Sequence, residues 1–340
     1  MWAPDQFMEQ LYHETYPDTK KEYNLEWQAQ VKKQFNEALG EFPNKDNEFN
    51  AKTLERVEFE DFVRIRVEIT TFASLRVPVY VLFPKENSGE KRPAALALHG
   101  HGYGSKEVVG LNVDGTNNLE EPPGIHKNFA VELVRRGVIV IAPELIGFAD
   151  RKLEKDFIPE ASSSHNSCFA LASQLLLMGK SLAGLRVAEC RRVIDYLTEL
   201  DAVDSENIGI IGLSGGGLVA AYTSAVDERV KATVICGYTN TFKGSIIDRN
   251  HCLDNYIPGV LSFAEMPELI GLIAPRPLFI ESGIDDPLFP IEQVKVAVKT
   301  LREIYQNFEA SHVLDSHYFK GKHEISGEES YDWLMTQLKK

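Results

Sequence analysis

From residue 93 onward, short apolar segments alternate with longer segments of helical periodicity. The apolar segments read PAALALHG, VIVIAP, NIGIIGLS, VKATVICG and RPLFIESG. Helix-like segments such as NFAVELVRRG and SLAGLRVAECRRVIDYLTEL separate them. Strands that are apolar throughout are buried on both faces, and their alternation with helices is typical of a parallel sheet. The sequence therefore predicts an α/β fold with a mostly parallel central sheet and helices on both faces.

Two other patterns precede this alternation. RVEFEDFVRIRVEITTF and RVPVYVLFP have a period of two, which predicts antiparallel strands, the second ending at Pro84. Before them, Trp27, Val31, Phe35 and Leu39 recur every four residues, which predicts one amphipathic helix. We expect residues 1–50 to form a helical arm that either caps the core or mediates homo-oligomer formation, and residues 51–340 to form the main domain.

Composition and charge restrict the partners and the location of the protein. The 340 residues carry a formal net charge of −14, whereas nucleic acids and anionic membranes attract basic surfaces. We therefore expect no nucleic-acid or membrane partner. The first residues lack the pattern of a signal peptide, and no apolar run reaches the length of a membrane span. The four cysteines show no CxxC spacing, so we expect neither zinc nor a disulfide framework, and a cytoplasmic protein.

Two long stretches interrupt the alternation, residues 103–124 and residues 238–266. Stretches of this length inside a compact domain are usually functional loops or lids. Ligands of open α/β sheets bind beyond the carboxyl ends of the strands, so we expect these stretches to line a site. Residues 238–266 are predicted to be a lid-like insertion.

A serine lies between glycines where a predicted strand meets a predicted helix. GLSGG, residues 212–216, matches the pattern G-x-S-x-G that places a nucleophilic serine on a sharp strand-to-helix turn. Glycine fits on both sides of such a turn because larger side chains would collide there. The phosphate-loop pattern G-x-x-x-x-G-K-[ST] and the dinucleotide pattern G-x-G-x-x-G are absent from this segment. Ser214 is therefore a candidate nucleophile.

A nucleophilic serine requires a histidine base and an acid that orients it, and in this architecture the chain order is serine, acid, histidine. His323 follows the last predicted strand and precedes the last helix, which favours it over His251, His312 and His317. Asp285 and Asp286 both follow the strand RPLFIESG, and Asp315 is a weaker third candidate. Spacing alone does not choose between Asp285 and Asp286.

Several motifs together resemble one family. LHGHGYGS resembles an oxyanion loop, APELIGFADR a P-[DE]-x-x-G-x-G-x-R turn, GLSGGG a nucleophile elbow, SGIDDPLFP an acid loop and KGKHEIS a histidine loop. Over residues 55–340 the chain resembles an α/β-hydrolase of the acetyl xylan esterase and dienelactone hydrolase-like branch. Ala149 departs from this pattern, because glycine often stands there. Ser214 stands where dienelactone hydrolases carry cysteine, which favours ester hydrolysis over lactone hydrolysis.

The resemblance implies a set of site residues. Ser214 would be the nucleophile, His323 the base and Asp286 the acid, with the oxyanion held by N–H groups of Gly215 and of His101 or Gly102. We expect Glu144 either to pair with Arg151 or to bind substrate. Alternating histidines at 99 and 101 without a further ligand cluster are a weak metal site, so we expect neither metal nor cofactor. The candidate substrate-pocket residues are Tyr103, Glu144, Phe148, Tyr238, Phe242 and Phe289.

The predicted function is serine hydrolysis of a small carboxylic ester, with a short, acetyl-like acyl group, through an acyl-enzyme. An acyl-peptide hydrolase or peptidase, a thioesterase and a carbon–carbon bond hydrolase are alternatives on the same fold. The large N-terminal β-propeller of many such peptidases is not found in these 340 residues, which disfavours that alternative. A catalytically inactive interaction protein is the alternative outside enzymes.

Overall fold

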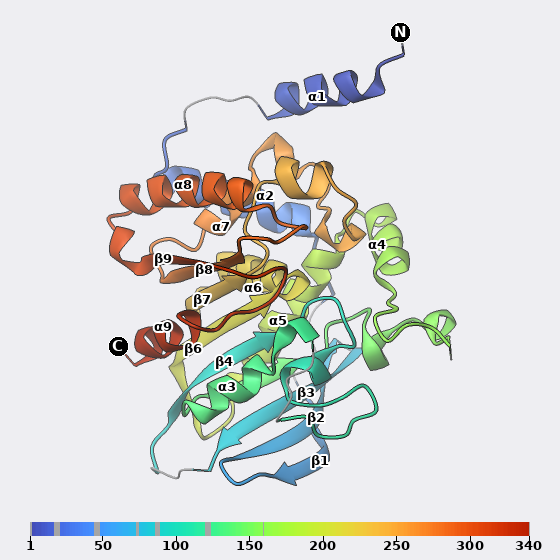
Figure 1. Ribbon diagram of the computed structural model, residues 1–340, viewed down its shortest axis with the longest axis vertical. Helices are drawn as coiled ribbons and strands as arrows, with labels where there is room; N and C mark the ends of the chain where they lie inside the picture. The colour runs from blue at the N-terminus through green and yellow to red at the C-terminus, as the bar shows by residue number, and fades with distance from the viewer. Residues whose placement is uncertain are drawn as a thin grey trace.

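A computed structural model describes residues 2–16, 21–43, 48–72, 75–85, 89–119, 124–158 and 160–339. Its strands form one nine-stranded sheet in the order β1-β2-β3-β5-β4-β6-β7-β8-β9 (Figure 1). The pairs β1–β2, β2–β3 and β3–β5 are antiparallel, and all pairs from β5 to β9 are parallel. The predicted mostly parallel sheet is thereby confirmed. The strands are β1 (Lys52–Glu58), β2 (Phe62–Phe72), β3 (Leu75–Pro84), β4 (Arg92–Leu98), β5 (Ile139–Pro143), β6 (Val203–Leu213), β7 (Val230–Cys236), β8 (Leu278–Gly283) and β9 (Leu314–Phe319).

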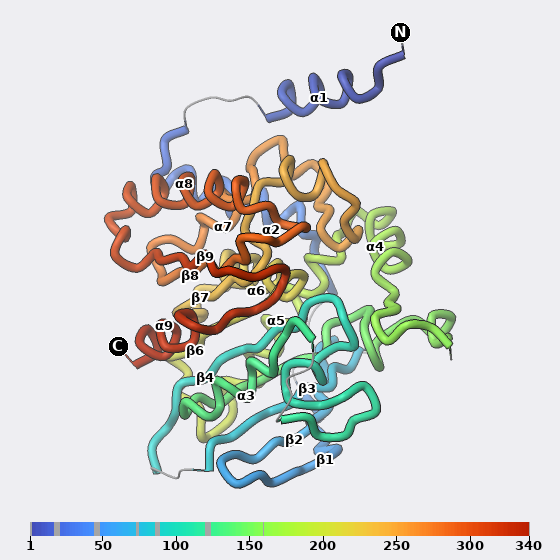
Figure 2. Tube along the Cα trace, viewed as in Figure 1, coloured from blue at the N-terminus to red at the C-terminus, as the bar shows by residue number. Residues whose placement is uncertain are grey.

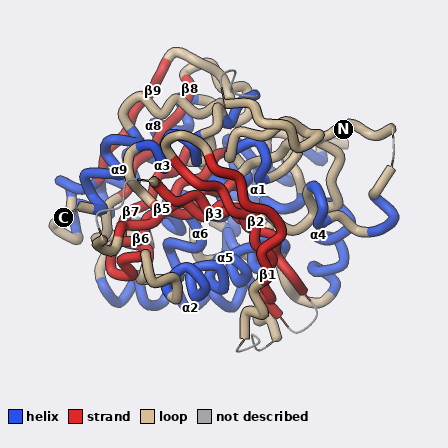
Figure 3. The backbone as a smooth tube through the Cα atoms, turned by 90° about the horizontal axis from the view of Figure 1, so that it is seen from below, coloured by secondary structure: helices blue, strands red, loops and turns tan. Residues whose placement is uncertain are grey.

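Helices cover both faces of the sheet, as predicted (Figure 3). Helices α2, α5, α6, α7 and α8 contribute to one apolar core, and α3 and α9 to a second core on the other side. Neighbouring residues of β6 point to opposite cores, Ile210 to the first and Ile211 to the second. The bounds are α2 (Leu25–Leu39), α3 (Phe129–Arg135), α4 (Cys168–Leu177), α5 (Leu182–Thr198), α6 (Gly215–Val226), α7 (Met266–Gly271), α8 (Ile291–Asn307) and α9 (Ser330–Leu338).

The N-terminal residues contain two helices where the sequence predicted one. The predicted helix is α2, whose Val31, Phe35 and Leu39 are buried, with Phe35 packed edge-on against Tyr222 at a ring-centroid distance of 5.0 Å. The additional helix α1 (Pro4–Thr15) has no buried residue and lies at the end of the molecule opposite β1 (Figures 1 and 2). Its apolar residues Phe7, Met8 and Leu11 recur with helical spacing, but all three are exposed.

Three segments lie beyond the carboxyl ends of the parallel strands. The first follows β4 and contains the short helices η1 (Ser105–Val108) and η2 (Gly124–His126). The second follows β5 and contains η3 (Ala149–Arg151), η4 (Glu154–Asp156) and α4. The third follows β7 and contains the π-helical turn η5 (Phe242–Ile247), then η6 (Leu253–Asn255) and η7 (Val260–Ser262). In addition, η8 (Ser311–Val313) leads into β9.

Across the described ranges, no single helix has the length and apolar character that a membrane span requires. Helices α4 and α5 meet that requirement only when taken together, and they are bent by 100° relative to each other.

Candidate active site

Ser214 lies on the turn between β6 and α6. Its φ of 57° and ψ of −121° place a non-glycine residue in a region that side chains rarely adopt. The turn is fixed by neighbouring backbone, because the Ser214 N–H donates to the Cys236 carbonyl at 2.9 Å. A Cβ on Gly212 would lie 2.2 Å from the Gly216 carbonyl oxygen, and one on Gly216 would lie 2.1 Å from the Leu98 carbonyl oxygen. The two flanking glycines are therefore required by packing against backbone.

Replacing Gly216 by alanine is expected to lower the free energy of unfolding by about 3 kcal/mol or more, because strand and helix backbone must separate. Urea unfolding monitored by circular dichroism measures this change. Gly259→Ala is the control, since Gly259 has a φ of 71° but no atom within 4 Å of the added methyl group. It should cost only about 1–2 kcal/mol, the penalty of the left-handed conformation. Equal costs at the two positions would contradict the close packing at the elbow.

The predicted base and acid are in contact. His323 Nδ1 lies 2.8 Å from Asp286 Oδ2, and both side chains are mostly buried. Asp286 Oδ1 accepts from the N–H groups of Leu288 at 2.8 Å and Phe289 at 3.0 Å, which fixes the carboxylate. Asp285 is exposed, and its N–H donates to the Gly321 carbonyl at 2.9 Å. The structure therefore brings Asp286, and not Asp285, to His323.

Ser214 and His323 meet at the carboxyl end of β7. Ser214 is bonded through its N–H to Cys236, and the His323 ring lies against the next residue, Gly237. A Cβ on Gly237 would lie 3.4 Å from both Cε1 and Nδ1 of His323. The Ser214 hydroxyl makes no hydrogen bond to His323 within the described residues, and such bonds often close only when substrate binds. Ser214 keeps 8% of its surface exposed.

The segment after β4 leaves two N–H groups unpaired next to the elbow. The Gly100 N–H donates to His126 Nε2 at 2.8 Å, and the Tyr103 N–H donates to Glu107 Oε1. Between them, neither His101 N–H nor Gly102 N–H has an acceptor among the described residues. The His101 ring lies over Gly215, with Nδ1 3.3 Å from where a Cβ on Gly215 would be. The three predicted oxyanion-hole residues are therefore gathered at the amino end of α6, where the helix favours negative charge.

Two buried histidines, His126 and His99, hold this segment through hydrogen bonds to its backbone, a role that sequence reasoning did not predict. His126 Nδ1 lies 2.8 Å from Glu107 Oε2, and burial lowers the pKa of His126, which keeps Nε2 an acceptor for Gly100. His99 Nδ1 donates to the Gly100 carbonyl at 2.8 Å, and His99 Nε2 accepts from the Leu145 N–H at 3.0 Å. His99 thus positions the loop backbone rather than facing a ligand.

The histidine loop depends on Glu281, another residue that sequence reasoning missed. Its carboxylate, buried in β8, accepts from the N–H groups of Ser326 at 2.8 Å and Gly327 at 3.0 Å and from the Ser330 hydroxyl at 2.7 Å. A glutamate inside the apolar strand LFIESG is the signal that could have identified it, because a buried carboxylate requires several donors.

Most of the predicted substrate-pocket residues are buried and bonded internally. Glu144 accepts from the N–H and hydroxyl of Ser105, so it offers no free group to a substrate. The hydroxyl groups of Tyr238 and Tyr222 are hydrogen-bonded to each other at 2.8 Å. The hydroxyl of the half-buried Tyr103 donates to the Leu111 carbonyl at 3.0 Å.

The predicted aromatic pocket and the predicted ion pair also need correction. Phe148 packs under the His101 ring, Phe289 stacks on His323 at 5.7 Å, and Phe242 is buried in the core. These aromatic side chains support the site instead of lining an open pocket. The predicted Glu144–Arg151 ion pair is not formed, because Arg151 pairs with Glu189 at 2.7 Å and touches only the backbone carbonyl of Glu144.

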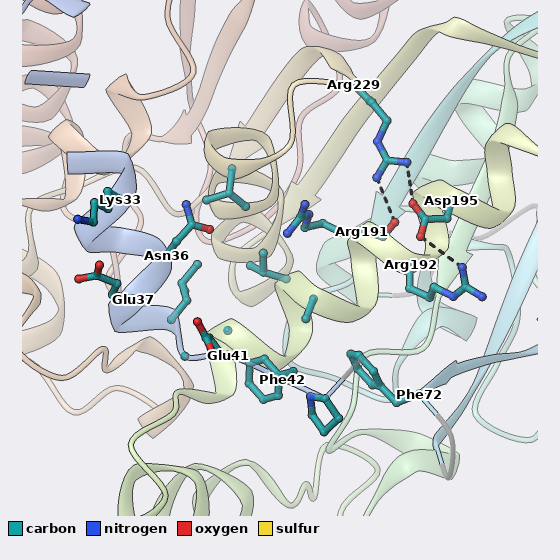
Figure 4. A pocket seen from close by; sticks show the side chains of 17 residues that line it. Lys33, Asn36, Glu37, Glu41, Phe42, Phe72, Arg191, Arg192, Asp195 and Arg229 are labelled. Atoms are coloured by element: carbon teal, nitrogen blue, oxygen red, sulfur yellow. Dashed lines mark hydrogen bonds and ion pairs between the residues drawn. The ribbon is translucent and has the colours of Figure 1, made fainter. Parts of the chain in front are cut away.

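Two large surface hollows lie away from Ser214. One of about 710 Å³ lies between α2 and α5 (Figure 4), and one of about 1340 Å³ lies between α1, η5 and α8. In the first, Arg229 and Arg192 are both paired with Asp195. Neither hollow is lined by a residue of the predicted triad.

Comparison with known proteins identifies the family. The model of the abhydrolase family matches residues 7–324, nearly the whole chain. The chain belongs to the abhydrolase family. The match also reaches into the N-terminal helices, beyond the residues 55–340 that the motifs covered. The predicted α/β-hydrolase fold and superfamily are confirmed.

The individual proteins that this chain resembles share less than a third of its sequence. A Bacillus subtilis (strain 168) protein named "Putative hydrolase YtaP" is 29% identical over 283 residues, which cover 82% of this chain and 87% of that protein. A structure described as a "putative acetyl xylan esterase" from Bacteroides fragilis NCTC 9343 superimposes with a TM-score of 0.76 at 15% identity, covering 98% and 89% of the two chains. A glucuronoyl esterase from Solibacter usitatus gives a TM-score of 0.64 at 15% identity, covering 92% and 90%. The names agree with the predicted enzyme class, a carboxylic-ester hydrolase.

Proposed function

We propose that this abhydrolase cleaves small carboxylic esters with Ser214, His323 and Asp286, through an acyl-enzyme. One observation carries the proposal. A serine on a strained strand-to-helix turn and a histidine–aspartate pair at 2.8 Å meet at the same edge of the sheet. A strained backbone at a site edge is a frequent feature of functional residues, and this arrangement matches the needs of nucleophilic catalysis.

In the proposed mechanism each nitrogen of His323 has its own role. Nδ1 is bonded to Asp286, so its proton stays there and Nε2 is free to accept the Ser214 proton. The Ser214 oxygen attacks the ester carbonyl, the alcohol leaves with the proton from His323, and the acyl group is held on Ser214. Water then attacks the acyl group while His323 again accepts a proton, which releases the acid.

The negative oxygen of each tetrahedral intermediate requires donors. The unpaired N–H groups of His101 and Gly102 and the first N–H of α6, on Gly215, lie beside Ser214. Each such donor lowers the barrier by roughly 2.7–4 kcal/mol in enzymes of this kind. The hydrogen bonds of His126 and His99 to the neighbouring backbone fix these donors before substrate arrives, so little reorganisation is needed during the reaction.

The proposed substrate is a small ester with a short acyl group, acetyl in the simplest case. The low exposure of Ser214 and the mostly buried His323 favour a short acyl chain over a long one. The names of similar structures, acetyl xylan esterase and glucuronoyl esterase, suggest esters of carbohydrates as a class to test.

A series of p-nitrophenyl esters from acetyl to octanoyl tests the acyl preference. We expect kcat/KM to fall by roughly 10²-fold or more along the series, because methylenes that do not fit cost of order 1–3 kcal/mol. Equal rates across the series would reject the short-acyl proposal. An acetylated xylose, a methyl glucuronate ester, an acyl thioester and an N-acylated peptide test the substrate class. Faster turnover of the thioester or the peptide than of every oxygen ester would reject the carboxylic-ester proposal.

A further inference from the structure

Four side chains with metal-binding atoms meet beside the elbow, although they are far apart in the sequence. They are His101, Cys168, Cys252 and Asp254, and their ligand atoms all lie within 4.8 Å of one another. His101 comes from the segment after β4, Cys168 from the first residue of α4, and Cys252 and Asp254 from the segment around η6. We propose that this cluster is a structural zinc site.

The distances suit a small four-coordinate ion. His101 Nε2 and Asp254 Oδ2 are 3.5 Å apart. Ligand atoms around a tetrahedral zinc, with bonds of about 2.0–2.3 Å, are separated by about 3.3–3.8 Å. The cluster therefore reaches zinc geometry with side-chain movements of about 1 Å or less. Two sulfurs, one imidazole nitrogen and one carboxylate oxygen form a donor set that favours zinc over calcium or magnesium.

One ligand atom makes no hydrogen bond among the described residues. His101 Nε2 is buried, and its contact to Asp254 Oδ2 at 3.5 Å is too long for a hydrogen bond. A buried nitrogen without a hydrogen bond is costly, and a metal ion would satisfy it. The other ring nitrogen, Nδ1, lies toward Gly215 and stays free of the cluster.

A buried arginine completes the charge balance. Arg186 donates to Asp254 Oδ2 at 2.6 Å and to Cys168 Sγ at 3.1 Å, and its side chain is fully buried. When zinc binds, each thiol releases its proton to solvent. Two thiolates, one carboxylate, Arg186 and Zn²⁺ then sum to zero charge, which a buried cluster tolerates best. Arg186 would act as the outer partner that orients two of the ligands.

The site would tie three chain segments together at the active-site edge. His101 carries one of the unpaired N–H groups beside Ser214, so zinc would hold that group in place from the side-chain end. Helix α4 and η6 would be fastened to the same point. The proposal concerns metal binding alone and stands whether or not Ser214 is the nucleophile.

Metal content and a cobalt spectrum test the proposal. The full chain is purified without a histidine tag under reducing conditions, loaded with Zn²⁺ and freed of excess metal by gel filtration. We expect one zinc per chain by elemental mass spectrometry. With Co²⁺ in place of zinc, we expect the thiolate charge-transfer absorption and the intense visible bands of a tetrahedral site. Ser214→Ala should retain both signals, so loss of activity and loss of metal are distinguishable.

Cysteine variants locate the site. Cys252→Ser is the test variant, because Cys252 is only half-buried and its loss should leave the fold intact. Its zinc affinity, measured by competition with a chromophoric chelator, should fall by at least 10²-fold. Cys190→Ala, which removes a buried cysteine outside the cluster, should keep the wild-type affinity. If the Cys252→Ser variant binds one zinc per chain with wild-type affinity, the proposal is overturned. A reduced, folded chain that binds no zinc would also overturn it. So would a Cys168–Cys252 disulfide, found in protein purified without reductant, that after reduction is formed again by air oxygen even when zinc is present.

Discussion

Ser214→Ala is expected to lower kcat for p-nitrophenyl acetate by roughly 10⁴–10⁶-fold, the loss seen when the nucleophile of a serine triad is removed. The substitution removes the atom that forms the acyl-enzyme. It leaves the elbow intact, because the turn is held by the Ser214 N–H and by the flanking glycines rather than by the hydroxyl. Steady-state kinetics measures the loss, and circular dichroism and the thermal midpoint should match those of the wild type.

Ser262→Ala is the matched control for this change. Ser262 is an exposed serine in η7 whose hydroxyl donates to the Gly259 carbonyl at 2.7 Å. Its replacement should leave kcat within about twofold, because exposed substitutions away from a site change little. Ser214→Ala protein free of wild-type enzyme that keeps more than a hundredth of the activity would contradict the role of Ser214.

Asp286→Asn is expected to lower kcat by roughly 10²–10⁴-fold. Asparagine can keep an oxygen toward the N–H groups of Leu288 and Phe289, so the loop should survive. Its amide nitrogen would then face His323 Nδ1 and donate to it, which places the imidazole proton on Nε2. In that tautomer His323 cannot accept the Ser214 proton, so kcat falls while KM changes little.

Asp285→Asn is the matched control, because the neighbouring side chain is exposed and touches neither His323 nor the elbow. It should keep kcat within about twofold. The sequence left both aspartates open from spacing, and only the family resemblance favoured Asp286. An equal loss in both variants, or a larger loss in Asp285→Asn, would contradict the 2.8 Å contact as the functional pair.

The alternating strands and helices of the parallel part of the sheet were predictable from the sequence. Apolar strands that are buried on both faces stand out in the sequence, so the parallel strands from β4 to β8 and the helices α3 and α5 between them were placed correctly, whereas α4 and α7 were not predicted. The elbow was predictable because few residue patterns permit such a tight turn. Helix α1 was not predicted, although Phe7, Met8 and Leu11 have helical spacing, and its apolar face is exposed and packs against no core.

The side-chain partners in the loops could not be predicted. The predicted pocket residues Phe148, Tyr238 and Phe289 are aromatic residues near strand ends, and a loop has no period to show whether such a side chain points inward or outward. The structure places all three in packed surroundings. The partners Glu107 with His126, and Glu281 with Ser330, join residues far apart in the chain, and only the folded topology brings them together.

The same reason explains why the sequence argued against a metal. Zinc sites are recognised in sequences by cysteines and histidines at short spacing, and Cys168 and Cys252 are separated by helices α5 and α6 and strands β6 and β7. The segments after β4, β5 and β7 all begin at the carboxyl edge of the sheet, and His101, Cys168 and Cys252 meet beside it. The topology therefore assembles a cluster that no local motif records.

Labelling with a fluorophosphonate probe tests the central assignment most directly, because the probe reacts covalently with an activated serine and not with an ordinary hydroxyl. Intact-mass and peptide mass spectrometry of the labelled full chain should show one adduct per molecule, located on Ser214. The adduct should be absent from Ser214→Ala and strongly reduced in Asp286→Asn, and unchanged in Ser262→Ala. A folded wild-type protein that stays unlabelled, or one that carries the adduct on another residue, would contradict the assignment of Ser214 as the nucleophile.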